Sequence, residues 1–566
     1  MKRMVPILIA SAVLICNASA QLVGGKHGLH KTHTGTVGNA QFGSSACGPG
    51  DINGDGIPDY VIGAKSHTNT LASQGRITAY SGSSHSVLWT VDGESLGDWF
   101  GYAMVAMGDL DDDGFGDIVV SAPRVDNLFK IDSGRAYAIS GATGSTIWTH
   151  TSAVSNRQFG TALGSGLDIN SDGYQDLIAG MSSADDGGLI EAGKISVLDG
   201  KDGSFIGHIY ATSSYAHFGT SVASAGDLNA DGVDDIIVGV PDKSPSGITS
   251  AGRVTIISGN YLLTGSGSKY VGWIDGIWSN GQFGHSVCGL GDQDGDGVNE
   301  FAVGEPYADL STTLVEAGFA YVYSGASLTK LATFISGGDH DHFGYTVAPA
   351  GDMNSDGVID LLVGAPDRGT GGSALTFSIR ELGWLNEWVG GYTFAKFGAV
   401  MTTIGDLDGN NTAEYMVCAP ELTLPISKEG QARIYGIDPF LRLSKYTASL
   451  AGDTVEFYAD FESTHVLDYY RFLFSWAGDG PDSSIGLLVP LTADSAFHKS
   501  VAGTFPPIFS NGTGQLGSGA KATATLSFAS TLPIAPGTQL YCCVVAADRF
   551  TYSPQTSSIV QILTFN

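Results

Sequence analysis

The chain of 566 residues carries 57 acidic and 27 basic side chains, which gives a formal net charge of −30. A surface this acidic argues against nucleic acid and against an anionic membrane as the partner. The length exceeds that of one ordinary hydrophobic core, and the 80 glycines are typical of many short strands joined by tight turns.

The first 20 residues have the layout of an export signal. Two basic residues precede an apolar run from Val5 to Ile15, and an Ala-Ser-Ala cleavage site ends at Ala20. No later segment approaches the roughly 20 apolar residues of a transmembrane helix. We therefore expect residues 1–20 to be removed and the mature protein to be secreted or held at the cell surface, with no transmembrane segment after the signal peptide.

Residues 21–29 form a short N-terminal segment, in and after which His27, His30 and His33 follow at every third position. This spacing is compatible with a zinc site. An extended, mobile chain terminus is the interpretation that we favour.

Between residues 30 and 438 one acidic motif recurs seven times. In the second copy, residues 108–117, a run of aspartates and glycines leads directly into three apolar residues. The copies are separated by 58, 59, 59, 65, 60 and 54 residues, and a period this regular is the signature of a repeat architecture.

Each copy places a carboxylate or an amide at positions 1, 3, 5 and 9 of the loop. Alternating oxygen donors on a tight loop suit a hard cation that takes six to eight oxygens at about 2.3–2.6 Å, so we expect up to seven calcium ions. The loops contain no Cys or His, which argues against zinc. The expected ligands are, loop by loop, Asp51, Asn53, Asp55 and Asp59; Asp109, Asp111, Asp113 and Asp117; Asp168, Asn170, Asp172 and Asp176; Asp227, Asn229, Asp231 and Asp235; Asp292, Asp294, Asp296 and Glu300; Asp352, Asn354, Asp356 and Asp360; and Asp406, Asp408, Asn410 and Glu414.

Two further loop positions distinguish this motif from an EF-hand. Position 6 is Gly in six copies and Asn411 in the seventh, as expected where the chain turns sharply with a positive φ. Position 12 is apolar in every copy, whereas an EF-hand needs a bidentate Glu there. The loops therefore lead into buried strands, and we interpret the calcium as structural.

The order of elements within a repeat is constant. In the second copy Phe100-Gly101 opens a short strand, the acidic loop follows, and the next strand ends at Ala122-Pro123. A variable loop then leads to two more strands, with no helical period. Four short strands per repeat are typical of a propeller blade, so the sequence predicts an all-β, seven-bladed β-propeller.

The Phe-Gly start, the acidic loop and the Gly-Ala-Pro end resemble the FG-GAP repeats of integrin α-chain propellers and of their secreted bacterial relatives, over residues 30–438. This resemblance implies calcium loops on one face of the propeller and a partner-binding face opposite, built from the loops between the second and third strands and between blades. No interval has room for the inserted domain of some integrin chains, and no transmembrane helix follows, so integrin-type signalling is not implied. Phe-Gly begins at Phe42, Phe100, Phe159, Phe218, Phe283, Phe343 and Phe397.

The seventh repeat stops after its third strand, near residues 434–437. The segment from His30 to Val37 stands where a fourth strand would precede Phe42. We expect this segment to pair with blade seven and close the ring, because closure removes exposed strand edges.

The residue before each Phe-Gly should belong to a ring around one mouth of the central channel. Trp99 and the amides of this ring would suit sugar binding, or Trp99 would pack against its neighbouring blade, and the sequence leaves both open. The run Asp339-His340-Asp341-His342 is interpreted as a solvated loop rather than a metal or ligand site. The ring comprises Gln41, Trp99, Gln158, His217, Gln282, His342 and Lys396.

After the propeller the period ends. Residues 439–566 alternate in strand fashion and are punctuated by Gly and Pro, and their number suits one C-terminal β-sandwich. Cys47, Cys288 and Cys418 are interpreted as small buried residues, so disulfides are not expected to hold the fold.

The sequence has no Gly-x-Ser-x-Gly, His-Glu-x-x-His or phosphate-binding loop, and no catalytic residue is assigned. The favoured function is an exported calcium-binding propeller for extracellular or cell-surface adhesion, with a protein or a glycan as its ligand. Two alternatives stay open: a polysaccharide hydrolase or lyase, which would need a basic, aromatic-lined pocket, and a purely structural envelope component.

Overall fold

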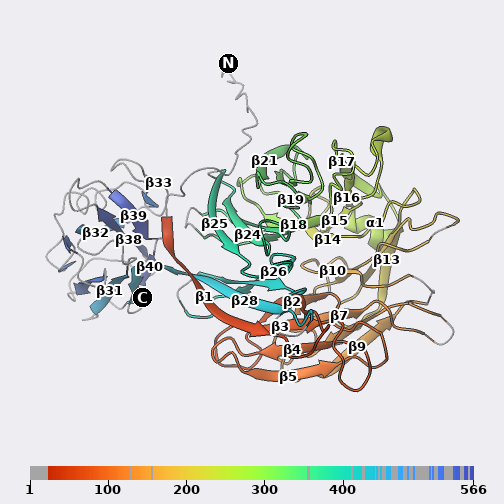
Figure 1. Cartoon of the computed structure of the whole chain (residues 1–566), viewed down its shortest axis with the longest axis horizontal. Coiled ribbons are helices and arrows are strands. Elements are labelled where there is room, and N and C mark those ends of the chain that lie inside the picture. The colour runs from red at the N-terminus through yellow and green to blue at the C-terminus, as the bar shows by residue number, and fades with distance from the viewer. Residues whose placement is uncertain are drawn as a thin grey trace, which may run out of the picture.

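The computed structural model (Figure 1) describes residues 23–439, apart from 128–129, 154–156, 186, 354–356, 381, 410–411 and 424–426. The expected signal peptide and the expected ligands Asn354, Asp356 and Asn410 lie outside the described residues. The expected C-terminal sandwich also lies outside them, apart from the bounds of its strands. The signal peptide and the sandwich therefore stay predictions. These strands are β29 (Leu441–Leu443), β30 (Thr447–Ala448), β31 (Thr454–Asp460), β32 (Tyr469–Ser475), β33 (Pro481–Asp482), β34 (Val489–Pro490), β35 (Phe509–Ser510), β36 (Thr513–Gln515), β37 (Lys521–Ser527), β38 (Gln539–Ala547), β39 (Pro554–Ser558) and β40 (Gln561–Phe565).

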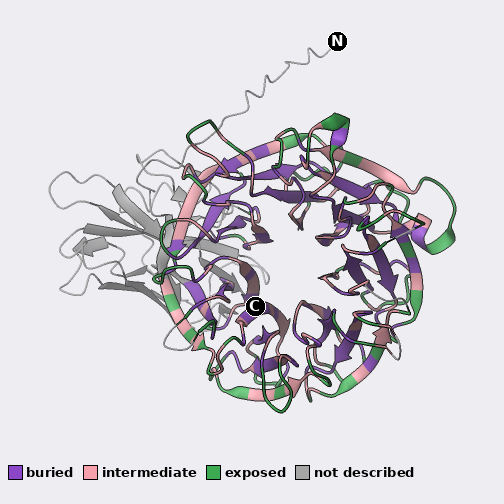
Figure 2. Cartoon of the chain, turned by 45° about the vertical axis from the view of Figure 1, so that its right-hand side comes forward, coloured by how far each residue is buried: buried purple, intermediate pink, exposed green. Residues whose placement is uncertain are grey.

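Residues 23–439 form a seven-bladed β-propeller, as the repeat period predicts. Figure 2 shows the blades arranged radially around a common centre. Six blades are antiparallel sheets of four consecutive strands, and the seventh takes its fourth strand from the start of the chain.

The first three blades follow the repeat order without interruption. Blade one contains β2 (Phe42–Gly50), β3 (Asp59–Ala64), β4 (Arg76–Tyr80) and β5 (Val87–Asp92). Blade two contains β6 (Met104–Gly108), β7 (Asp117–Ala122), β8 (Arg135–Ile139) and β9 (Thr146–Thr151). Blade three contains β10 (Ala162–Gly164), β11 (Leu177–Met181), β12 (Lys194–Leu198) and β13 (Phe205–Tyr210).

Blade four departs from the expected all-strand repeat. It contains β14 (Val222–Gly226), β15 (Asp235–Gly239), β16 (Arg253–Ile257) and β17 (Tyr270–Asp275), with a 3-10 turn, η1 (Pro245–Gly247), and one short helix, α1 (Gly259–Thr264). The helix begins after Ser258, whose side chain accepts a hydrogen bond from the Tyr261 N–H, and ends at the left-handed Gly265. A single helical turn leaves no period in the sequence, which is why it was not predicted.

The last three blades return to the simple pattern. Blade five contains β18 (Ser286–Gly291), β19 (Glu300–Glu305), β20 (Phe319–Tyr323) and β21 (Lys330–Ile335). Blade six contains β22 (Thr346–Pro349), β23 (Leu361–Ala365), β24 (Ser373–Ser378) and β25 (Gly383–Val389). Blade seven contains β26 (Val400–Gly405), β27 (Glu414–Ala419), β28 (Gln431–Pro439) and β1 (Val23–Thr34).

The two ends of the propeller meet in blade seven, where β1 lies beside β28 (Figure 1). The strands pair antiparallel from Thr34 opposite Gln431 to Gly25 opposite Pro439. The predicted ring closure is therefore confirmed, and the closing strand begins at Val23 rather than His30. The interpretation of the three histidines as a mobile terminus is wrong, because all of them lie in this paired strand.

The core lies between neighbouring blades. The second strand of every blade is buried along its whole length, because both faces of each sheet pack against the next sheet. The Phe of most Phe-Gly pairs is also buried and forms a parallel bridge to a glycine of the preceding blade, as at Phe100 and Gly75. Each such bridge joins two sheets through their backbones.

These bridges predict a sharp effect of one methyl group. Gly75 has φ +87°, and a Cβ there would lie 2.0 Å from the Phe100 carbonyl oxygen. Gly97 has φ +79° but open space around its Cβ position. We expect Gly75→Ala to lower the free energy of unfolding by roughly 3 kcal/mol or more, and Gly97→Ala by only about 1 kcal/mol. Denaturant melts of the two variants separate the steric clash from the backbone strain. Equal losses of unfolding free energy in the two variants would contradict the predicted clash.

Candidate functional site

The acidic loops join the first and second strands of each blade, and their backbone follows the predicted pattern. Every position-6 glycine in loops one to six has φ between 82° and 94°. Its N–H donates to Oδ2 of the position-1 aspartate at 2.7–2.9 Å in all six. The sequence did not reveal that position 4 is left-handed as well, because only some copies have Gly there. The residues with positive φ at position 4 are Gly54, Asp112, Ser171, Ala230, Gly295 and Gly409.

Position 9 has a structural role in addition to the predicted one as ligand. All seven of these carboxylates are fully buried, and each accepts a hydrogen bond from the position-2 N–H at 2.6–3.1 Å. In blades one to four the other oxygen accepts from a glycine N–H in the turn after the third strand, as Asp59 does from Gly82 at 2.8 Å. Burial raises the pKa of Asp117 to about 6 and that of Asp176 to about 7, and neighbouring carboxylates add to the rise.

Two loops bring three predicted ligands together. In loop two, Asp109, Asp111 and Asp117 each place an oxygen within 4.8 Å of the others. In loop five, the residues at positions 1, 3 and 9 do the same, and position 9 is Glu300. The aspartates at position 5 are not part of either group. In loop one the position-3 residue is Asn53, whose amide donates to the position-9 carboxylate at 3.1 Å.

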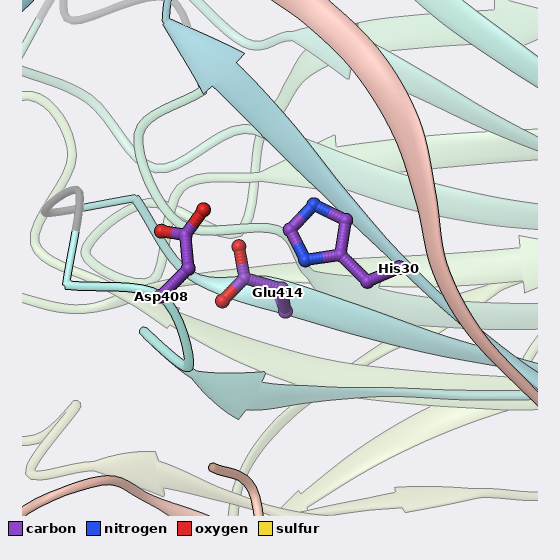
Figure 3. Close-up of side chains that lie close together, drawn as sticks. All are labelled: His30, Asp408 and Glu414. Carbon is purple, nitrogen blue, oxygen red and sulfur yellow. The ribbon is translucent and has the colours of Figure 1, made fainter. Parts of the chain in front are cut away.

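Loop seven lies beside a candidate ligand, His30, that the sequence analysis did not connect with it. His30 places a ring nitrogen within 4.8 Å of oxygens of Asp408 and Glu414 (Figure 3). His30 comes from the closing strand β1, whereas Asp408 lies in the loop and Glu414 opens β27. Only the strand register of the closed ring brings these residues together, so no sequence spacing could link them.

The opposite face carries the ring of residues that precede Phe-Gly. Each first strand has a ring residue before its start and an acidic loop after its end, so the two sets lie on opposite faces. All seven ring residues are left-handed, with φ between 46° and 60°, although none is Gly. We refer to these seven residues as the rim. A backbone strained at seven equivalent positions is a feature of the repeat rather than an accident of one loop.

Trp99 is the one tryptophan of the rim, and it is half-buried. Its ring stacks on Tyr102 with centroids 6.0 Å apart, and the Arg124 guanidinium carbon lies 3.6 Å from the Trp99 centroid. Lys65, from blade one, lies over both rings. Trp99 is therefore held between cations and a tyrosine, which differs from simple packing against the neighbouring blade.

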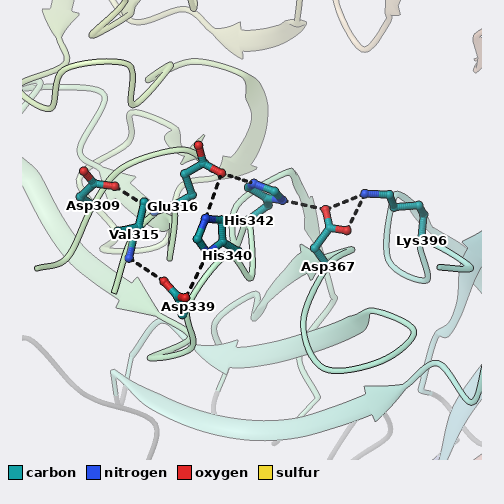
Figure 4. Close-up of polar contacts among 8 residues, drawn as sticks. All are labelled: Asp309, Val315, Glu316, Asp339, His340, His342, Asp367 and Lys396. Carbon is teal, nitrogen blue, oxygen red and sulfur yellow. Dashed lines mark hydrogen bonds and ion pairs between the residues drawn. The ribbon is translucent and has the colours of Figure 1, made fainter. Parts of the chain in front are cut away.

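A polar network crosses the rim between blades five, six and seven (Figure 4). His342 Nδ1 lies 2.7 Å from Asp367 Oδ2, and its Nε2 lies 3.0 Å from Glu316 Oε2. Lys396 Nζ donates to the same Asp367 oxygen at 2.7 Å. His217 repeats this arrangement, and its hydrogen bond with Asp242 raises the pKa of His217.

The run from Asp339 to His342 is only partly the solvated loop that we expected. Asp339 and His340 are exposed. Asp341 is buried and accepts hydrogen bonds from Arg368 Nη1 at 2.7 Å and Ser336 Oγ at 2.6 Å. Half of the run therefore fixes the rim loops in place, which its charge alone did not indicate. Among the described residues, no helix is long and apolar enough to cross a bilayer.

Comparisons with known proteins agree with this architecture. The family model of the FG-GAP repeat matches residues 159–198 and 218–257, in the third and fourth blades. The chain is 33% identical over 242 residues to Integrin alpha-5 of Xenopus laevis, covering 41% of this chain and 22% of that protein. It is 30% identical over 210 residues to Integrin alpha-V of Gallus gallus, covering 35% and 19%. It is 34% identical over 173 residues to Phosphatidylinositol-glycan-specific phospholipase D of Bos taurus, covering 29% and 20%.

The matched region thus spans about a fifth of the length of each of these relatives. One of the three is named as an enzyme, so similarity to the propeller does not by itself assign an activity. Repeat period, blade topology, loop geometry and sequence similarity agree on one point: the chain carries a seven-bladed β-propeller with FG-GAP repeats, similar to part of the integrin α chains.

Proposed function

We propose that this protein is an exported propeller that binds calcium at its acidic loops and binds an extracellular protein or glycan through the rim. The observation that carries the calcium part is the repeated loop geometry. In loops two and five the carboxylates of positions 1, 3 and 9 face one another within 4.8 Å. Carboxylates this close repel each other unless a cation lies between them.

The donor set of these two loops fits calcium. Its donors are all oxygens, which suits a hard cation. In loop five, Glu300 Oε1 is buried and has no hydrogen-bond partner in the described part of the chain, although Asp292 and Asp294 are adjacent. A buried carboxylate oxygen without a partner is costly, and a bound cation would satisfy it.

Calcium at these loops would neutralise the carboxylates and fix the loops to their blades, and we assign it no chemical step. Asp109, Asp111 and Asp117 would hold the ion in loop two, and the matching residues would do so in loop five. Loop seven differs, because His30 adds a nitrogen donor to Asp408 and Glu414. This mixed set also suits a borderline cation such as zinc.

The rim is the surface that we propose for ligand binding. It combines the cation-flanked Trp99 with carboxylates and histidines bridging neighbouring blades. Aromatic and charged side chains held in fixed positions are typical of binding hot spots. The similarity to integrin α chains favours adhesion over a purely structural role.

An array of polysaccharides and matrix proteins tests this function. We expect the mature protein to be retained by one class of ligand in calcium, and retention to fall at least about tenfold in Trp99→Ala, since truncating an aromatic hot-spot residue costs about 2 kcal/mol or more. Phe205→Ala, which removes an exposed ring on blade three outside the rim, is the control. Released sugar or cleaved product would favour the enzyme alternative, and a blank array would favour the structural one.

A further inference from the structure

A cleft on the flank of the propeller lies between blades three and four, and its lining residues Ala216 and Phe218 flank the rim residue His217. Its volume is about 330 Å³, within the usual range for small-ligand pockets. One wall is the linker of residues 211–216 that follows β13. The other wall comes from blade four and includes Lys243, Arg253, Thr255, Tyr270 and Trp273.

The cleft concentrates positive charge on a strongly acidic protein. Arg253 is paired with Asp275, with Nε 2.5 Å and Nη2 2.9 Å from its carboxylate oxygens. Lys243 Nζ instead donates to the neutral Ser213 Oγ at 2.8 Å. Lys269 precedes the lining residue Tyr270, and its Nζ donates to the Tyr210 carbonyl oxygen at 3.4 Å. These contacts leave two ammonium groups facing neutral oxygens, so the local charge is opposite to the net charge of −30.

Aromatic rings line the same cleft. Trp273 is 55% exposed, which is unusual for the largest apolar side chain on a folded surface. Arg253 lies over its ring, with the guanidinium carbon 5.3 Å from the centroid. Tyr270 is half-buried beside it, with Lys269 Nζ 5.1 Å from its ring. Flat rings with hydroxyl groups and cations at their edges are the surface on which pyranose rings stack.

We propose that this cleft binds an anionic sugar residue of an extracellular polysaccharide, with its ring against Trp273 and Tyr270 and its acidic group toward Lys243. The class of ligand follows from the combination of aromatic rings and lysines in one cleft. The aromatic faces alone would accept a neutral sugar, and the lysines alone would accept any anion. Ser213 and Thr255 add hydroxyl groups that match the hydroxyl groups of a sugar. The cleft is a second site, which shares no residue with the group of side chains around Trp99.

The competing explanation is that Lys243 only fastens the 211–216 linker to blade four. Burial lowers the pKa of Lys243 and the positive charge of Arg253 adds to this effect, whereas the negative charge of Asp275 acts against it. An anionic group of a ligand beside Lys243 would act in the same direction as Asp275. Lys243→Gln separates the two explanations, because glutamine keeps a donor for Ser213 but removes the charge.

Calorimetric titration of the mature protein in calcium tests the proposal with three oligosaccharides: a uronate hexamer, a sulfated hexamer and a neutral hexamer. We expect one or both anionic hexamers to bind, and the neutral one to bind at least about tenfold more weakly, since charged hydrogen bonds are about twice as strong as neutral ones. Raising the salt concentration should weaken the binding. The uronate and sulfate arms identify which acidic group is recognised.

Variants locate the binding. Trp273→Ala and Lys243→Gln should each weaken it at least about tenfold, with unchanged melting temperatures. The controls are Phe205→Ala, an exposed ring on blade three, and Lys330→Gln, a lysine over Tyr321 on blade five, and both should bind like the wild type. Equal affinity for the neutral hexamer, or unchanged affinity in Trp273→Ala, would overturn the proposal. Loss in Trp99→Ala alone would move the glycan site to the rim and leave the proposed function standing.

Discussion

Chelation of calcium should lower the melting temperature of this propeller in proportion to the number of loops that hold an ion. A ligand that binds only the native state stabilises it by about 2.7 kcal/mol per site when its concentration is about 100 times its Kd. Unfolding entropy is about 2.1 cal/mol/K per residue, so roughly 400 propeller residues give about 0.85 kcal/mol/K. Each emptied site should then lower the melting temperature by about 3 °C.

The size of the drop distinguishes two structural possibilities. Loading only loops two and five, where three carboxylates converge, predicts a loss of about 6 °C. Loading all seven loops predicts a loss of about 20 °C. Scanning calorimetry in excess calcium and in excess EGTA measures the difference. Asp111→Ala removes a ligand without touching the buried Asp117, and should reduce the drop by one step. An unchanged melt, with no metal in the purified protein, would contradict calcium binding.

The architecture could be predicted from the sequence because it rests on local patterns that repeat. Position 6 of the loop has a positive φ that lets its N–H reach the position-1 carboxylate, and six of the seven copies have glycine there. Ring closure was predictable too. The seventh repeat lacks a fourth strand and an extra strand precedes the first repeat, so pairing the two completes the last blade. The start of the closing strand was not, because Val23 to Leu29 has no strand-like alternation.

The finer features of the sites depend on contacts between blades, which no local pattern reveals. His30 and Glu414 are far apart in the chain and meet only because β1 pairs with β28 in one register. The flank cleft combines the linker after blade three with the outer strands of blade four. The enzyme alternative asked for a basic, aromatic-lined pocket, and the sequence could not show that Lys243 and Trp273 share one.

Glu305 offers a second large effect, because it is a carboxylate buried among aromatic rings. It ends β19, is 1% exposed, and accepts a hydrogen bond from the Tyr321 hydroxyl at 2.7 Å. A Cβ at Gly281 would lie 2.5 Å from Glu305 Oε1, so the absent side chain makes room for the carboxylate. Burial raises the pKa of Glu305 to about 8, although its bond to Tyr321 and the charge of Lys330 act against the rise.

The raised pKa makes the propeller less stable as the pH rises. Between the unfolded pKa of about 4.3 and the folded pKa of about 8, the native state holds a proton that the unfolded chain has released. Stability is therefore full below about pH 4 and falls by up to about 1.4 kcal/mol per pH unit until pH 8. Glu305→Gln keeps the shape and removes the titration, so its melting temperature should match the wild type at pH 5 and exceed it by several degrees at pH 8. Measuring the two proteins side by side in saturating calcium cancels the pH response of the acidic loops, which both share. A constant difference across this range would mean that Glu305 is ionised in the folded protein, with a cation or water in contact with Oε1.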